Sequence, residues 1–223
     1  MKFAWQQIPS PIVSEILCSM KNDGLVLDTE HGAFNNETLV SCIQVATLMR
    51  KKCLVRLAKA TTTMIRICLD AGASGLIFST VESGKSAKRI MDICHYPSQR
   101  STGRRGMGLV RQNSWGRNSL TVDKPIMIAQ IETKEGVDCI HEIARHKFDY
   151  YLIGPYDLTS SLGCEGNFDN PAYLSAIKAI TDLVGKSKMG VHIPSSVKTQ
   201  IHKYSGYGIL ALGMDTTLMI EAH

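Results

Sequence analysis

The feature of this sequence that most restricts its fold is a regular alternation of short β-like apolar runs with longer stretches of helical spacing. Eight such β-like runs occur in 223 residues, and no Pro-, Gly- or Ser-rich linker divides them. Strands that alternate with helices form parallel sheets, because each helix returns the chain to the start of the next strand. The pattern therefore predicts a single (β/α)8 barrel domain, the TIM barrel of the α/β class, over residues 1–223.

The expected elements can be given by residue range. The predicted strands cover residues 3–6, 25–28, 53–57, 75–78, 126–131, 150–153, 189–192 and 208–211. The predicted helices cover residues 11–21, 36–51, 62–71, 83–94, 135–144, 171–186 and 196–204. Only residues 216–223 follow the last strand, so we expect a shortened C-terminal helix. Residues 96–124 lack periodicity, and a segment of this length suggests a functional loop or a covering element.

Composition excludes several classes of protein. With 44% hydrophobic and 20% charged residues, the chain is typical of a globular protein that buries a core. Its apolar runs are far shorter than the roughly 20 residues of a membrane-spanning helix, and Pro9 interrupts the N-terminus before a secretory signal could form. The seven cysteines are scattered and no CxxC motif occurs, which predicts buried, unpaired thiols in a reducing cytoplasm and argues against zinc.

The net charge of +5 does not indicate a nucleic-acid-binding protein. The basic residues are dispersed, apart from a group formed by Arg100, Arg104, Arg105 and Arg111, and aromatic residues make up only 6% of the chain. A nucleic-acid interface usually combines a basic stripe with aromatic side chains. The arginine group is better suited to a small anionic substrate.

Polar residues at the ends of the predicted strands are the candidates for chemistry, because a barrel places its active site at the carboxyl ends of its strands. The candidates at or just after these strand ends are Asp28, Glu30, His31, Arg56, Gln130, Glu132, Tyr156 and Asp157. Gln130 and Glu132 are two positions apart, so both point to the same face of their strand. We expect that face to be the mouth of the barrel.

Four of these residues allow two interpretations each. Glu132 and Asp157 follow adjacent strands, so they either share a hard cation such as Mg²⁺ or Mn²⁺ or act as ordinary salt-bridge partners. His31 is either a general base or a hydrogen-bonded structural histidine. Arg56 either stabilises a developing enolate or forms an ion pair at a strand end.

Six motifs together resemble the HpcH/HpaI aldolase family, in the same order and with the same spacing. They are LDTEHG (27–32), VRL (55–57), LDAGASG (69–75), RGMGLVRQNSWG (105–116), QIET (130–133) and GPYDLTSSLG (154–163). The resemblance covers nearly the whole chain. It implies a barrel of the pyruvate/phosphoenolpyruvate superfamily and a class II, metal-dependent aldolase that cleaves a 4-hydroxy-2-oxo acid to pyruvate and an aldehyde.

The resemblance also implies roles for individual residues. Glu132 and Asp157 would bind the divalent metal, with Mg²⁺ or Mn²⁺ expected and Co²⁺ as a further candidate. Arg56 would stabilise the enolate oxygen, and Gln130 would lie beside the metal. Backbone N–H groups around Tyr156 and Asp157 would hold the pyruvate carboxylate.

His31 would exchange protons with the aldol hydroxyl through water, and Asp70 would orient this histidine from a neighbouring subunit. A homo-oligomer, with dimers that assemble into hexamers, is therefore implied, together with small-molecule substrates and neither a nucleic-acid nor a membrane partner.

Some positions depart from the family pattern. Ala58, Lys59 and Ala60 stand where many members have proline and a nearby aspartate, and Ser79 stands where many have proline. These differences leave the aldehyde unassigned. Two other functions stay open: a citrate lyase β or malyl-CoA lyase-like enzyme acting on a CoA thioester, and a barrel without catalytic turnover.

Overall fold

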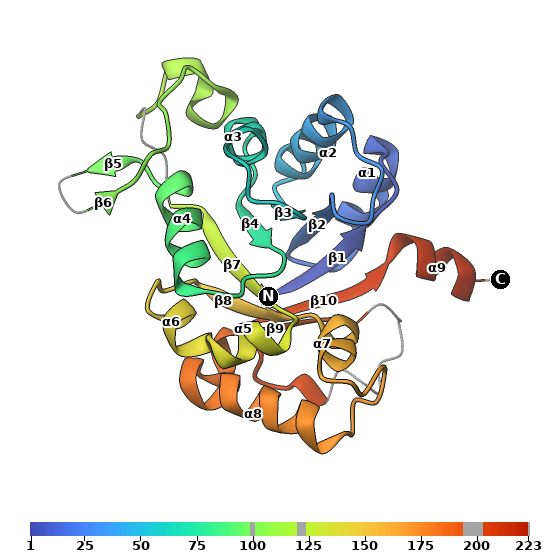
Figure 1. The fold of residues 1–223 in the computed structure, drawn as a ribbon. Helices are drawn as coiled ribbons and strands as arrows, with labels where there is room; N and C mark the ends of the chain where they lie inside the picture. Colours follow the sequence, from blue (N-terminus) through green and yellow to red (C-terminus); the bar gives the residue numbers. More distant parts are fainter. Residues whose placement is uncertain (99–100, 120–123, 194–202, 223) are drawn as a thin grey trace.

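The chain forms a closed barrel of eight parallel strands surrounded by helices (Figure 1). The computed structural model describes residues 1–98, 101–119, 124–193 and 203–222. The barrel strands are β1 (Lys2–Gln6), β2 (Gly24–Asp28), β3 (Lys52–Leu57), β4 (Gly75–Phe78), β7 (Ile126–Ile131), β8 (Tyr150–Ile153), β9 (Met189–Ile193) and β10 (Ile209–Met214). Each strand pairs with its predecessor in the barrel, and β10 closes the barrel against β1. The predicted (β/α)8 barrel is confirmed.

The helices follow the strands in the expected order. They are α1 (Pro11–Ser19), α2 (Asn36–Leu48), α3 (Thr62–Ala71), α4 (Gly84–Cys94), α5 (Lys134–Asp138), α6 (Ile140–Ala144), α7 (Pro155–Ser161), α8 (Pro171–Val184) and α9 (Asp215–Glu221). The predicted helix at 135–144 is divided at Cys139, and α7 was not predicted. The helix expected at 196–204 lies outside the described part of the chain, apart from its last two residues.

The segment expected to be irregular contains only short elements. Its described residues form a two-stranded ribbon, β5 (Pro97–Ser98) with β6 (Ser101–Thr102), and a 3₁₀ helix, η1 (Arg111–Gly116). A second 3₁₀ turn, η2 (Lys186–Lys188), lies between α8 and β9. Arg111 Nη1 donates to the carbonyl of Ala71 at 3.0 Å, which ties η1 to the end of α3.

Period-two alternation along the strands separates two apolar layers. One layer fills the barrel with inward side chains, among them Phe3, Val26, Leu54 and Ile128, and the other packs the outer strand faces against the helices. Successive inward positions in a strand are two residues apart. The inward residues that follow Val26, Leu54 and Ile128 are therefore Asp28, Arg56 and Gln130, which end the apolar filling with a polar layer.

The cysteines agree with the sequence prediction. All seven are unpaired, and five are buried while Cys139 and Cys164 are half-buried. Burial raises the pKa of the Cys68 thiol to about 12. No helix in the described part of the chain is long and apolar enough to cross a membrane.

The helix α9 covers seven residues, Asp215–Glu221, and its first residue connects the last barrel strand to the end of the first one. Asp215 is buried, and its carboxylate accepts hydrogen bonds from the backbone N–H groups of Gln7, at 3.0 Å, and Ile8, at 2.8 Å. These groups lie just beyond β1, so Asp215 supplements the pairing of β1 with β10.

Asp215→Ala should lower the free energy of unfolding by about 1–3 kcal/mol, because it leaves the N–H groups of Gln7 and Ile8 without their acceptor. Urea unfolding followed by circular dichroism measures the change. Asp138→Ala is the control, since it removes an exposed ion pair with Lys134 that water screens, and it should change the free energy of unfolding little. Equal losses in the two variants would contradict the role assigned to Asp215.

Candidate active site

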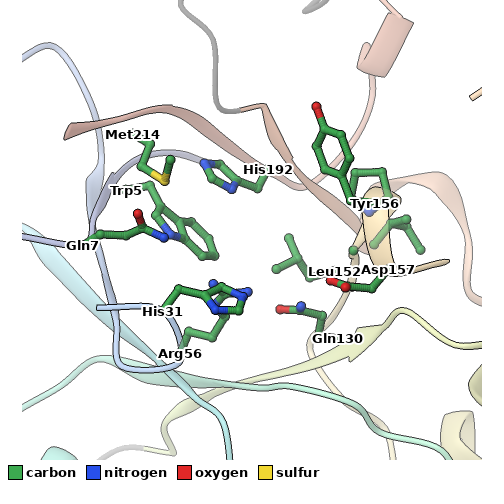
Figure 2. Close-up of a pocket in the computed structure, with 13 residues that line it drawn as sticks. Trp5, Gln7, His31, Arg56, Gln130, Leu152, Tyr156, Asp157, His192 and Met214 are labelled. Atoms are coloured by element: carbon green, nitrogen blue, oxygen red, sulfur yellow. The ribbon is translucent and has the colours of Figure 1, made fainter. Parts of the chain in front are cut away.

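A cavity of about 330 Å³ opens at the carboxyl ends of the barrel strands, where the predicted site residues were expected (Figure 2). Strands from both halves of the barrel and the loops after them contribute to its wall. The lining residues are Trp5, Gln7, His31, Arg56, Gln130, Leu152, Ile153, Gly154, Pro155, Tyr156, Asp157, His192 and Met214. Five predicted site residues, His31, Arg56, Gln130, Tyr156 and Asp157, thus share one cavity.

Arg56 is held in the cavity wall by two carboxylates. Its Nε and Nη2 atoms donate to Asp28 at 2.8 and 2.5 Å, and Nη1 lies 2.9 Å from Oε2 of Glu30. The guanidinium carbon lies 4.9 Å from the ring centroid of Trp5. A guanidinium has five N–H donors, so the three bonds leave two donors for another oxygen. The predicted ion pair exists, and it leaves Arg56 able to bind an anionic ligand.

Asp28 is fully buried and collects donors from three parts of the chain. Besides Arg56, its carboxylate accepts from Trp5 Nε1 at 3.1 Å, from Gln7 Nε2 at 3.2 Å and from the backbone N–H of Glu30 at 3.1 Å. Burial by itself would raise the pKa of Asp28, but the bonds and the charge of Arg56 outweigh burial and lower this pKa to about 2. Asp28 is therefore ionised throughout the neutral range.

Glu132 lies behind the cavity wall rather than in it. Its Oε1 atom accepts from both the backbone N–H and the hydroxyl of Thr80, each at 2.7 Å, and its Oε2 atom accepts from Nε2 of Gln130. Thr80 adopts a φ of 54°, which is uncommon for a residue with a branched side chain. The two bonds to Glu132 stabilise that conformation.

Asp157 does not end a strand as the sequence suggested, because the chain turns into α7 directly after Gly154. Asp157 and Tyr156 lie in the first turn of this helix, where backbone N–H groups have no intrahelical partner. Both residues are exposed and line the cavity, and Tyr156 packs edge-on against Phe168 at 5.3 Å.

The donor atoms around Gln130 suit a hard cation. Oε1 of Gln130 is buried and has no hydrogen-bond partner among the described residues. With the carboxylates of Glu132 and Asp157 it supplies an all-oxygen set, the type that Mg²⁺ and Mn²⁺ prefer. A Cβ at position 154 would lie 2.7 Å from Oε2 of Glu132, so Gly154 keeps the space beside that carboxylate open. In the described ranges no three His, Cys, Asp or Glu side chains form a metal-binding group.

The structure does not bring Asp70 to His31 within one chain. His31 is exposed at the cavity mouth, whereas Asp70 lies at the end of α3 and pairs with Nη2 of Arg105 at 3.0 Å. The exposed side chains of Leu109 and Trp115 line the same surface hollow as Asp70. The dyad inferred from the family resemblance therefore requires a second subunit and stays a prediction.

Trp5, Gln7, His192 and Met214 are among the cavity residues that the sequence analysis did not identify. His192 carried a usable signal, because it is the last residue of a predicted strand at 189–192 and is polar. The first predicted strand is short and gave no comparable signal. In the structure Trp5 lies in β1 and Gln7 directly follows it, and both line the cavity.

Comparison with known proteins finds similarity over nearly the whole chain. A family model described as HpcH/HpaI aldolase/citrate lyase matches residues 3–222. A hydroxypyruvate/pyruvate aldolase of Pseudomonas aeruginosa is 27% identical, over 98% of this chain and 84% of the relative. A 4-hydroxy-2-oxovalerate aldolase of Rhodococcus jostii (strain RHA1) is 28% identical, over 97% of this chain and 86% of the relative.

Solved structures with the same fold include a HpcH/HpaI aldolase/citrate lyase family protein from Burkholderia cenocepacia J2315. It superposes with a TM-score of 0.91 at 24% identity and covers 100% of this chain and 91% of its own. The citrate synthase SbnG superposes with a TM-score of 0.82 at 26% identity, over 99% of this chain and 89% of its own.

Asp28 should make stability depend on pH in the acid range. Because its pKa is about 2 in the folded protein against 3.8 ordinarily, its contribution is complete above pH 4 and is lost as the pH falls toward 2. The expected loss is about 2 kcal/mol, measured as the free energy of urea unfolding at several pH values. Asp28→Asn should be less stable at neutral pH by about 1.5–3 kcal/mol, because Arg56 loses the charged acceptor of two hydrogen bonds and keeps its ion pair with Glu30. If this variant keeps the wild-type change between pH 4 and 2, another carboxylate causes it.

Proposed function

The chain belongs to the HpcH/HpaI aldolase/citrate lyase family, and we propose that it is a metal-dependent class II aldolase. The reaction is the reversible cleavage of a 4-hydroxy-2-oxo acid to pyruvate and an aldehyde. The observation that carries the proposal is that one cavity is lined by an arginine with free donors, Arg56, and by Gln130 and Asp157, with the Glu132 carboxylate bonded to Gln130 directly behind the wall.

The metal site of the proposal consists of the Glu132 and Asp157 carboxylates with the amide oxygen of Gln130 beside them. A divalent cation there, Mg²⁺, Mn²⁺ or Co²⁺, would polarise the 2-oxo group and make the adjacent C–H bonds acidic. Thr80 holds Glu132 in place, since both of its bonds go to the same carboxylate oxygen.

Arg56 and α7 would bind the two ends of the pyruvate unit. The free N–H groups of Arg56 would donate to the oxygen that becomes the enolate, and its bonds to Asp28 fix the plane of the guanidinium beforehand. The backbone N–H groups of Tyr156 and Asp157 would donate to the carboxylate. The contact with Arg56 strengthens as negative charge develops on the enolate oxygen, and so it favours the transition state, whereas the contacts to the carboxylate hold the substrate in place.

In the cleavage direction a base takes the proton of the C4 hydroxyl. The C3–C4 bond then breaks, C4 becomes the aldehyde carbonyl, and the electron pair of the bond forms the enolate. A proton delivered to C3 completes pyruvate. His31 is the candidate for accepting the first proton through water, because it stands at the open mouth of the cavity.

Glu132→Ala and Asp157→Ala should each abolish the exchange of pyruvate methyl protons with deuterated solvent, because each removes one of two carboxylates in the donor set. Proton NMR of pyruvate with added Mg²⁺ or Mn²⁺ measures this exchange and needs no knowledge of the aldehyde. Asp182→Ala, at an exposed position paired only with Lys178, is the control and should exchange like the wild type. Exchange at the full rate in excess chelator would refute the metal dependence.

The same assays separate the alternative functions. An enzyme of the citrate lyase β or malyl-CoA lyase type would cleave CoA thioesters and not free hydroxy-oxo acids. A barrel without turnover would bind pyruvate but show no exchange.

We further propose a homo-oligomer in which Asp70 of one subunit orients His31 of another. The pairing with Arg105 leaves Asp70 about one-third exposed, on a surface that also carries the exposed Leu109 and Trp115. Such a surface is suited to cover by a second copy of the chain.

Mixing His31→Ala with Asp70→Ala subunits should restore part of the activity that each variant lacks by itself. Some sites in a mixed oligomer then receive an intact histidine and an intact aspartate. The measurement is aldol cleavage after subunit exchange, with light scattering to confirm assembly. A fully active monomer would exclude the oligomer proposal, and an active oligomer without complementation would exclude the shared dyad.

A further inference from the structure

Ser79 directly follows β4, and the reaction described above makes no use of it. Its hydroxyl donates to Oε2 of Glu30 at 2.7 Å, and the same oxygen lies 2.9 Å from Nη1 of Arg56. Arg56 lines the active-site cavity (Figure 2), whereas Ser79 and Glu30 are not among the lining residues. The three side chains therefore form a line of contacts that begins outside the cavity and ends at the arginine in its wall.

The contact with Glu30 holds a part of Arg56 that Asp28 does not reach. Asp28 accepts from Nε and Nη2, which together form one edge of the planar guanidinium. Nη1 lies outside that edge, and among the described residues its partner is Glu30. Glu30 thus supplies the third point that fixes the orientation of the guanidinium, and Asp28 supplies the other two.

The Glu30 carboxylate is not fixed by burial. Its side chain is 20% exposed, whereas that of Asp28 is fully buried. A glutamate side chain has several rotatable bonds, and a partly hydrated ion pair does little to restrict them. In the described part of the chain, Ser79 is the other side chain that donates to this carboxylate. Its hydroxyl therefore determines where Oε2 of Glu30 lies.

Ser79 is itself tied to the strand that carries Arg56. Its backbone N–H donates to the carbonyl of Leu57 at 3.2 Å, which extends the pairing of β3 with β4 beyond Phe78. Leu57 directly follows Arg56 in β3. The hydroxyl of Ser79 is therefore held at a fixed place relative to the arginine on which it acts.

We propose that Ser79 is a positioning residue that acts through Glu30 and holds Nη1 of Arg56 in the orientation that stabilises the enolate oxygen. This inference rests on the proposed aldolase function. Ser79 contacts neither the substrate nor the metal. Its contribution should be largest where negative charge develops on the oxygen that Arg56 contacts, and small in the binding of the uncharged 2-oxo group.

Ser79→Ala should slow the exchange of pyruvate methyl protons at saturating pyruvate by roughly three- to tenfold, the effect of losing about one hydrogen bond. The KM for pyruvate should change much less. Ser79→Thr keeps the hydroxyl and should exchange at nearly the wild-type rate. Ser41→Ala is the matched control, because the hydroxyl of Ser41 donates only to the carbonyl of Glu37 in α2.

Inhibition of the exchange by oxalate separates positioning from a loss of folded protein. Oxalate is a planar dianion that places a charged oxygen where the enolate oxygen would form. In Ser79→Ala its inhibition constant should rise by about the same factor as the exchange rate falls. A variant that is only partly folded has fewer active sites but binds oxalate normally, so an unchanged inhibition constant overturns the role of Ser79.

A double-mutant cycle tests whether Ser79 acts through Glu30. In the Glu30→Ala background, Ser79→Ala should cause no further loss of exchange, because the acceptor of its hydrogen bond is already absent. Losses that add in the double variant overturn the route through Glu30.

The wild type separates this proposal from the aldolase function. Normal exchange in the wild type with the same rate in Ser79→Ala overturns the role of Ser79 and leaves the aldolase proposal intact. Absence of exchange in the wild type with added Mg²⁺ or Mn²⁺ overturns the aldolase proposal.

The contact itself is then read from the ¹⁵N resonances of the Arg56 side chain, which need no activity. Separate Nη1 and Nη2 signals in the wild type, merged by faster rotation in Ser79→Ala, support the positioning of Arg56. The same spectrum in both proteins overturns it. This measurement also decides the case in which Glu30→Ala does not fold.

Discussion

The buried ion pair between Asp28 and Arg56 is the interaction on which the rest of the site depends. Removing a carboxylate from water is unfavourable unless its lone pairs are filled by donors, and Asp28 is supplied by β1, by β3 and by the turn that follows its own strand. The same bonds fix the guanidinium plane of Arg56, the indole of Trp5 and the start of the loop that carries His31. One carboxylate thereby orders three parts of the cavity wall.

A second buried carboxylate, that of Glu132, organises the part of the site at β7. Glu132 fixes Thr80 in an unusual backbone conformation and orients Gln130, while Gly154 leaves it room. These contacts hold the polar groups of β7 and of the loop after β4 before any ligand arrives. Because the side chains are already ordered, ligand binding does not have to offset the free-energy cost of ordering them.

Barrel closure brings the remaining residues together. Strands β1 and β9 lie on either side of β10, so Trp5 and His192 stack although almost the whole chain separates them. Asp215 reinforces the closure at this point through the backbone N–H groups of Gln7 and Ile8. The wall that contains His192 therefore exists only once the first and last strands have paired.

The sequence by itself determined the eight barrel strands and the polar strand ends at Arg56 and Gln130. These features follow from hydrophobic periodicity, which is a local property of the chain. Only the tertiary structure decided which side chains meet. It placed Asp157 in a helix, Glu132 behind the cavity wall and Asp70 beside Arg105, and it added Trp5 and His192 to the cavity. Such contacts depend on strand register and barrel closure, which join residues far apart in the chain and leave no periodic signal in the sequence.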